Sequence, residues 1–270
     1  MLKKKKKQPK KTMVDYDLME ELDYYQKPKP KKAIDQKLVI AAVLLVIFAA
    51  VLLFSPIFAV KEIRAEGASR FTTSALCEMI GLSTGDNILT FSKSKAEAAL
   101  EKDPYIADAK LSIDLPDTMI ITLKERKVRG YVPYMGSYLY IDEEGRVLDV
   151  QDAYFEALPL VKGLSFESFV NGEIIPVKNP EALDVVLEVS QMMEKYELLD
   201  LVVEIDVSDP EDVYAYVNQV QIHLGDMENG DTKIRYMAEI MKTIPAEDRG
   251  ILDLSELDNP KKSVVFQYLT

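Results

Sequence analysis

The feature that most constrains this chain is an apolar run of 23 residues, from Leu38 to Val60, that contains no charged side chain. A helix of this length rises about 35 Å, which is enough to cross a hydrocarbon core of about 30 Å. The run therefore predicts a transmembrane helix at 38–60. It leaves a tail at 1–37 and a much larger region at 61–270 on the other side of the membrane.

The charges on either side of the run indicate its orientation. The tail carries 12 lysines and six acidic residues, whereas the rest of the chain has a net charge of −18. Positive charge beside an anchor tends to remain in the cytoplasm. We therefore expect a single-pass type II protein of the cell membrane, with its C-terminal region outside the cell. A cleaved signal peptide is the alternative, but the run is longer than a typical signal sequence, and Ile57-Phe58-Ala59 lacks a small-x-small cleavage pattern.

Composition narrows the classes of ligand and of structure. The lysine-rich tail is of low complexity and is predicted to be disordered, and its charge suits the anionic membrane lipid of an inner leaflet. Its acidic and aromatic insert at 13–25 is either a short docking motif or part of the same disorder. The acidic outer region argues against nucleic acid as a ligand. Cys77 is the only cysteine, so no intramolecular disulfide can form and the outer region must depend on its core.

Residues 61–126 are predicted to form one compact α+β unit. The expected elements are a strand at 60–66, a helix at 72–81, a helix at 94–103, and strands at 106–114 and 118–125. Thr72 is the expected N-cap of the first helix and Gly81 its expected C-cap. Ser94 and Glu97 have the spacing of a capping box at the start of the second helix. The predicted order is strand, helix, helix, strand, strand.

The residues of this unit also carry a resemblance to a known family. The motifs are Phe58-x-Val60-x-x-Ile63-x-x-x-Gly67, Ile80-Gly81-Leu82-x-x-Gly85-x-Asn87-Ile88, Pro104-Tyr105-Ile106-x-x-Ala109 and Leu115-Pro116-x-Thr118-x-x-Ile121-x-x-x-Glu125-Arg126. Together they resemble a POTRA domain of the FtsQ/DivIB family of bacterial cell-division proteins. The preceding anchor fits that family. So do two later motifs, Tyr140-Ile141-Asp142-x-x-Gly145-x-Val147 and Leu158-Pro159-Leu160-Val161-x-Gly163.

Residues 127–270 are predicted to form a second α+β domain that is richer in strands. Strands are expected at 138–141, 145–148, 202–207, 213–217, 220–224, 251–254 and 263–269, and helices at 179–196 and 231–244. Val203, Ile205 and Val207 are expected to share one face of their strand, and Asp231 is expected to cap the second helix. These elements predict a mainly antiparallel sheet with two helices on one face.

The sequence offers little catalytic chemistry. His223 is the only histidine and is predicted to face solvent from the polar side of a strand. A hydrolytic zinc site usually requires more than one His or Cys ligand, and the chain has only one residue of each type. The chain also has neither a nucleophile elbow nor a phosphate-binding loop. Cys77 lies on the apolar face of its helix and is interpreted as a packing residue. We therefore expect no enzyme, no cofactor and no metal site.

The last strand is the candidate partner-binding site. It comprises Ser263, Val264, Val265, Phe266, Gln267, Tyr268 and Leu269. It has apolar or aromatic side chains on both faces and no charge, which is poor protection for a strand at the edge of a sheet. It is therefore either an edge that accepts a strand from a partner or an interior strand paired on both sides. In the first case, Val264, Phe266 and Tyr268 would share the face that sets the register.

The resemblance implies a function. In the FtsQ/DivIB family, the C-terminal end of the outer domain is taken to receive a segment of an FtsB/DivIC-like coiled-coil protein, which acts with an FtsL-like coiled-coil protein. The resemblance thus implies a non-enzymatic scaffold of the divisome at the division septum, linked to the septal peptidoglycan synthase complex. Two alternatives stay open: a POTRA-bearing extracytoplasmic assembly factor, and a membrane-anchored extracytoplasmic enzyme that depends on His223.

Overall fold

The computed structural model describes residues 35–53, 55–154, 157–257, 259 and 264–269, so nearly all of the predicted tail lies outside the described residues. Its first element is helix α2 (Gln36–Leu53), whose described apolar side chains are exposed. Within the described residues, no helix combines the length and the apolar character needed to cross a membrane. The prediction of one helix up to Val60 is wrong at its C-terminal end. Pro56–Phe58 form a short 3-10 helix, η1, and Val60 is buried in the core of the following domain.

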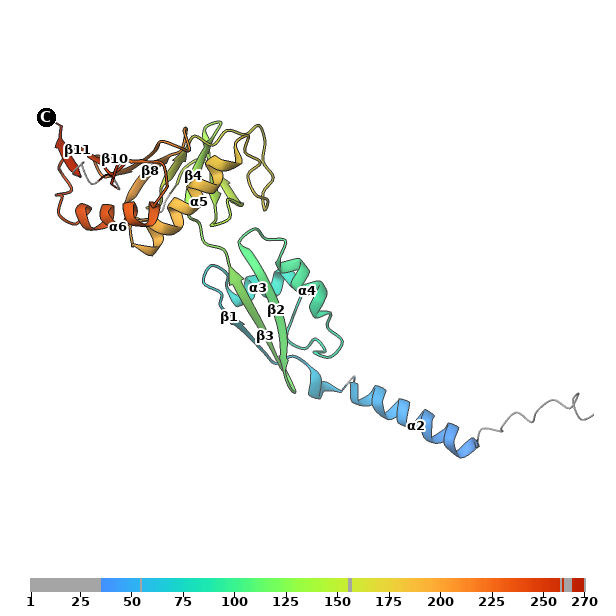
Figure 1. The fold of residues 1–270 in the computed structure, drawn as a ribbon. Helices are drawn as coiled ribbons and strands as arrows, with labels where there is room; N and C mark the ends of the chain where they lie inside the picture. Colours follow the sequence, from blue (N-terminus) through green and yellow to red (C-terminus); the bar gives the residue numbers. More distant parts are fainter. Residues whose placement is uncertain (1–34, 54, 155–156, 258, 260–263, 270) are drawn as a thin grey trace, which may run out of the picture. The chain divides into compact units, whose positions relative to one another are not determined.

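The small-sheet domain, residues 56–126, has three described strands with two helices on one face (Figure 1). Its elements are β1 (Glu62–Glu66), α3 (Thr73–Ile80), α4 (Lys93–Leu100), β2 (Ile106–Asp114) and β3 (Thr118–Glu125). The strand order is β1-β3-β2, with β1 parallel and β2 antiparallel to β3. Leu76 and Leu100 of the helices pack with Ile121 of the sheet. The predicted order of elements is confirmed.

The two helices of this domain differ in how well the local sequence predicts their starts. The Thr72 side chain caps α3 as expected, and Gly81 ends it in the left-handed conformation with φ of 64°. The N-cap of α4 is Ser92 rather than Ser94. The predicted capping box is therefore wrong, because the Glu97 carboxylate accepts a hydrogen bond of 2.8 Å from a backbone N–H of β2 instead.

The large-sheet domain, residues 127–269, has nine described strands with two helices on one face (Figure 1). Its elements are β4 (Gly130–Tyr134), β5 (Ser137–Ile141), β6 (Val147–Gln151), β7 (Leu160–Lys162), α5 (Pro180–Lys195), β8 (Val202–Asp206), β9 (Val213–Val217), β10 (Val220–Gly225), α6 (Gly230–Met241), β11 (Gly250–Asp253) and β12 (Val265–Tyr268). The order across the sheet is β12-β11-β10-β9-β8-β7-β4-β5-β6. Of the eight pairings between these described strands, five are antiparallel and three parallel. The prediction of an α+β fold with a mainly antiparallel sheet is confirmed.

The sequence does not predict two of these strands, β4 and β7. β7 has only three residues, and β4 contains Pro133, which usually argues against a strand inside a sheet. The N–H of Tyr131 donates to the carbonyl of Pro159 on the β7 side. The missing donor of Pro133 faces that same side, where β7 pairs with β4 only at Leu160. The missing N–H of Pro133 therefore does not cost the sheet a hydrogen bond between β4 and β7.

Two local expectations in this domain are wrong. The alternation predicted for β8 is interrupted at Val203, because a register shift opposite β9 turns its side chain outward, leaving it 54% exposed. Helix α6 begins after Asn229, so Asp231 is not its cap. The Asp231 carboxylate instead accepts hydrogen bonds from Lys195, at 2.5 Å, and from the Tyr196 hydroxyl, at 2.9 Å. It thereby joins the start of α6 to the end of α5.

Candidate partner-binding site

The last strand lies at an edge of the large sheet. β12 pairs antiparallel with β11 and is the terminal strand of the described sheet. Among the predicted site residues, Val264 and Leu269 flank this strand, and Ser263 lies outside the described residues. The alternative of an interior strand, paired on both sides, is not observed among the described strands.

The side chains of this strand divide between two faces. Val264 and Phe266 are half-buried and pack against the core beneath the helices. Val265 and Leu269 are exposed on the opposite face. Tyr268 is 65% exposed, and its ring meets that of Phe266 edge to face at 4.7 Å between centroids. Phe266 is therefore first a packing residue of its own domain, whereas Tyr268 has most of its surface available to a partner.

The absence of a side chain at Gly250 of β11 allows the Phe266 ring to lie over the backbone of that strand. A Cβ atom at this glycine would lie 2.3 Å from Cζ of Phe266 and 2.7 Å from the carbonyl oxygen of Gln267. The aromatic ring thus covers the bare backbone of the neighbouring strand. No periodicity in the sequence indicates this contact, because it depends on which strand pairs with the last one.

The register defines which backbone groups of β12 are directed out of the sheet. The N–H of Leu269 donates to the carbonyl of Arg249 at 2.9 Å. Hydrogen-bonding direction alternates along an antiparallel strand, so the odd-numbered residues of β12 direct their groups toward β11. The N–H and C=O groups of Phe266 and Tyr268 therefore point outward, in the geometry that strand addition requires.

The helix-free face of the sheet continues inward from this edge. Its row of cross-strand neighbours runs from Val265 through Asp253 and His223 to Tyr214. The His223 ring stacks on Tyr214 at 4.6 Å between centroids, and its Nε2 lies 2.5 Å from Oδ1 of Asp212. Sequence reasoning placed His223 on the polar face but missed these contacts, which hold the ring within the face.

The electrostatics of this row follow from those contacts. The hydrogen bond with His223 lowers the pKa of Asp212, partial burial opposes this change, and the Tyr214 hydroxyl adds to it.

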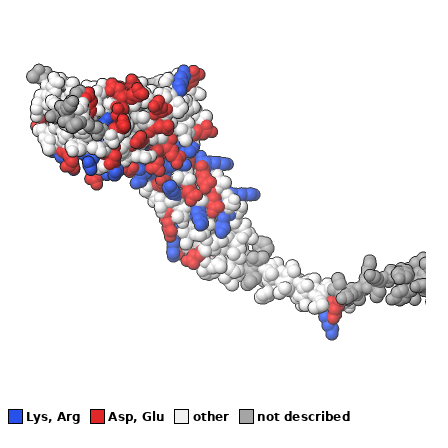
Figure 2. Space-filling view, viewed as in Figure 1, with Lys and Arg blue, Asp and Glu red and all other residues white. Residues whose placement is uncertain are grey.

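Figure 2 shows acidic side chains spread over the large-sheet domain. In the part of the chain that the structure describes, no cluster of His, Cys, Asp and Glu could hold a metal ion. Burial also raises the pKa of the Cys77 thiol, in keeping with a packing role.

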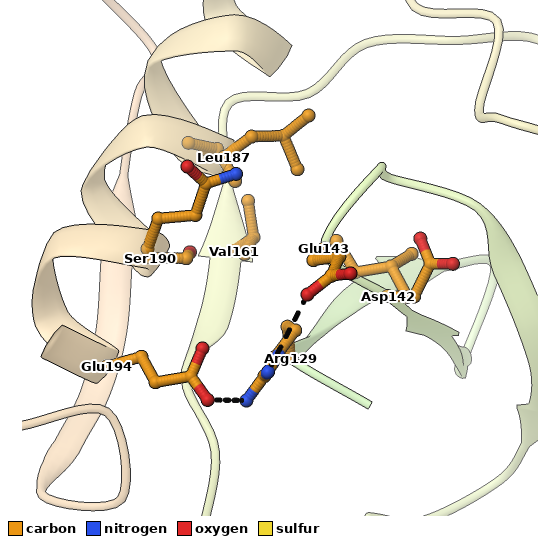
Figure 3. Close-up of a pocket in the computed structure, with 10 residues that line it drawn as sticks. Arg129, Asp142, Glu143, Val161, Leu187, Ser190 and Glu194 are labelled. Carbon is orange, nitrogen blue, oxygen red and sulfur yellow. Dashed lines mark ion pairs between the residues drawn. The ribbon is translucent and has the colours of Figure 1, made fainter. Parts of the chain in front are cut away.

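A small cavity between α5 and the turn after β5 is a second candidate (Figure 3). Its volume is about 10 Å³, which is room for about one water molecule. The Arg129 guanidinium pairs with Glu194 and lies 3.7 Å from the Glu143 carboxylate. These charges link the helix to the sheet, and the space is too small for a substrate.

Comparison with known proteins relates this geometry to a family. The model for the FtsQ-type POTRA domain matches residues 58–126, and the model for the C-terminal region of cell division proteins FtsQ and DivIB matches residues 130–256. β12 lies beyond the second match.

Relatives of known name extend over most of the chain. Cell division protein DivIB of Clostridium botulinum is 22% identical over 90% of this chain and 96% of its own length. DivIB of Listeria monocytogenes is 25% identical over 87% of this chain and 83% of its own length. With an FtsQ-type POTRA domain followed directly by the FtsQ/DivIB C-terminal domain, the chain belongs to the FtsQ/DivIB family of bacterial cell division proteins.

Proposed function

We propose that this chain is a membrane-anchored, non-enzymatic scaffold of the divisome that recruits a division partner through the outer edge of β12. The observation that carries the proposal is the outward direction of the backbone groups of Phe266 and Tyr268 at the end of a nine-stranded described sheet. Such an edge supplies ready-made hydrogen bonds for an added strand.

The anchor in this proposal is the apolar segment that contains α2 (Gln36–Leu53). It is supported by the exposed apolar side chains of α2, which would have no favourable contact in water, and by the lysines that precede it. The orientation is type II, with residues 56–270 outside the cell at the division septum. This placement would bring the open edge to extracytoplasmic partners.

The partner in this proposal is an FtsB/DivIC-like coiled-coil protein, acting with an FtsL-like protein and with the septal peptidoglycan synthase complex. An extended segment of the partner would pair with β12, and side chains at Val265, Tyr268 and Leu269 would contact it from both faces. Backbone pairing would supply affinity, and these side chains would set the register.

The test compares the full chain with a variant lacking residues 263–270, both in lipid nanodiscs. The coiled-coil partner is titrated calorimetrically, and circular dichroism checks that each protein is folded. We expect the full chain to bind and the shortened chain to lose binding. A folded, shortened chain that binds at full strength would refute the β12 site.

In dividing cells, a fluorescent fusion of the full chain is expected at midcell, and a uniform membrane distribution would refute the divisome role.

A further inference from the structure

Three exposed apolar side chains gather at one end of the small-sheet domain. Ile57 of η1 is 56% exposed, Leu115 in the turn between β2 and β3 is 61% exposed, and Leu89 is 39% exposed. We call these three residues the apolar rim. They come from separate segments of the chain, and nothing in the local sequence indicates that they belong together.

Backbone hydrogen bonds bring the three segments together. The N–H of Ile88 donates to the carbonyl of Phe58 at 2.9 Å, which places Leu89 next to η1. The N–H of Lys61 donates to the carbonyl of Asp117 at 2.8 Å, and the Lys61 ammonium pairs with the Asp117 carboxylate at 2.7 Å. These bonds place the turn that holds Leu115 beside the same stretch of chain, as Figure 1 shows for the tip of β2 and β3 and the neighbouring light-blue turn.

The outward direction of the rim is determined by the core behind it. Val60 and Ile88 are 1% and 0% exposed, and Phe58 is half-buried against the same cluster. Since these neighbours are fixed inward, Ile57 and Leu89 cannot turn into the core without unpacking it. The domain thus holds an apolar surface in solvent at one defined end.

We propose that the apolar rim docks on the lipid bilayer, at the interface between head groups and acyl chains. This inference rests on the proposed membrane anchor. Only three residues separate Leu53, the last residue of α2, from Ile57, and the four steps from one Cα atom to the next can span at most about 14 Å. An anchor in the membrane therefore keeps Ile57 near its surface, and the hydrogen bonds above bring Leu89 and Leu115 to the same surface.

The chemistry of the rim suits this interface. Leu and Ile beside a lysine form the combination that interfacial segments use, because the apolar groups enter the acyl boundary and a long cationic side chain reaches the head groups. Lys61, whose side chain is 66% exposed, lies beside the rim. Docking at three points would hold the small-sheet domain in one orientation on the membrane, instead of leaving it free on a short link.

The experiment places a fluorescent probe at single cysteines in the full chain, with Cys77→Ser, in phosphatidylcholine vesicles. Leu115→Cys and Leu89→Cys report the rim. Met135→Cys is the matched control, because Met135 is also apolar, 88% exposed and in a turn between two strands. Val46→Cys reports the anchor. We expect lipids that carry a shallow spin label to quench the probes at 115 and 89, and to leave the probe at 135 unchanged.

The outcomes separate this inference from the anchor on which it rests. Quenching at 46 by a deep spin label, without quenching at 115 and 89, would overturn the docking and leave the anchor intact. Absence of quenching at 46 would overturn both. In a Leu115→Asp background, we expect the probe at 89 to lose much of its quenching, since an ionised carboxylate opposes insertion of the rim. Unchanged quenching at 89 would overturn docking of the rim as a unit.

Discussion

The two edges of the large sheet are treated differently by the chain. At one edge, the segment around Gly172 covers β6: the N–H of Val147 donates to the carbonyl of Glu173 at 3.0 Å, and the N–H of Gly172 donates to the carbonyl of Val147 at 2.8 Å. The Arg146 guanidinium fixes this segment through a hydrogen bond of 2.7 Å to the carbonyl of Gly172. The edge at β6 is therefore partly satisfied by the protein itself.

At the other edge, no comparable segment covers β12 among the described residues. Its outward backbone groups, at Phe266 and Tyr268, lie beside the exposed side chains of Val265 and Leu269. Proteins usually block an open edge with charge, proline or a covering loop. Among the described residues, the edge at β6 is covered and the edge at β12 is open. An open edge can pair with other chains and aggregate unless a partner occupies it, which favours a docking role for β12.

The largest expected effect comes from removing one outward donor. Tyr268→Pro removes an N–H that points away from the sheet, so we expect β12 to remain paired with β11. We expect affinity for the proposed coiled-coil partner to fall about 100-fold, or about 3 kcal/mol, because an added strand would lose a hydrogen bond and meet the proline ring. Calorimetric titration of the full chain in nanodiscs measures this change.

Two matched variants sharpen this test. Tyr268→Ala keeps the donor and should weaken binding less than Tyr268→Pro. Gln267→Pro removes a donor directed toward β11 and should lower both stability and binding. Equal affinity of wild type and a folded Tyr268→Pro variant would show that the open edge is not the docking site.

The next largest effect concerns the packing that holds β12 in place. In Gly250→Ala, the new Cβ would collide with the Phe266 ring and with the carbonyl of Gln267. Since one of these contacts is backbone, turning the ring cannot relieve it, and we expect a loss of about 1–3 kcal/mol in the free energy of unfolding. Urea denaturation measures the loss. In a double-mutant cycle with Phe266→Ala, the two costs should be less than additive, and strict additivity would argue against the contact.

The bounds of β2 and β3, and the caps of α3 and α5, are predictable because they depend on neighbours a few residues away. Asn179, for example, is the residue at which the sequence predicts the helix to start, and its side chain accepts a hydrogen bond from Glu181 N at the start of α5. The candidate site could be predicted only in part. The residues of the last strand and their alternation follow from the sequence, but the edge position depends on pairing with β11.

The features that were missed also depend on distant partners. Phe266 packs inward because a glycine lies on the adjacent strand, and Val203 turns outward because of a register shift relative to β9. The cover over β6 comes from a loop with no periodicity of its own. Local patterns carry no information about such contacts, since each depends on segments that are distant from one another in the sequence.

A smaller effect should appear in amide hydrogen exchange, which compares the two edges directly. The N–H of Val147 is bonded to the covering segment, whereas the N–H groups of Phe266 and Tyr268 point outward. We expect the outward amides to exchange at least about tenfold faster than that of Val147 in the free protein, and to slow when partner binds. Mass spectrometry with residue-level fragmentation provides the rates. Equal protection of the two edges without partner would contradict the comparison.

The smallest effect concerns pH and the row beside the open edge. The hydrogen bond with His223 lowers the pKa of Asp212 below its usual value of 3.8, so the ionised carboxylate favours the folded state. This contribution is present above about pH 3.8 and is lost as the pH falls through the lower folded value. The Asp212 side chain is 46% exposed, and solvent screening limits the contribution to less than about 1 kcal/mol.

Asp212→Asn should therefore lose less stability than wild type between about pH 6 and about pH 3, measured as urea midpoints. Asp200→Asn, at an exposed carboxylate, serves as the control, and identical acid losses in wild type and Asp212→Asn would exclude this interaction as a source of pH dependence.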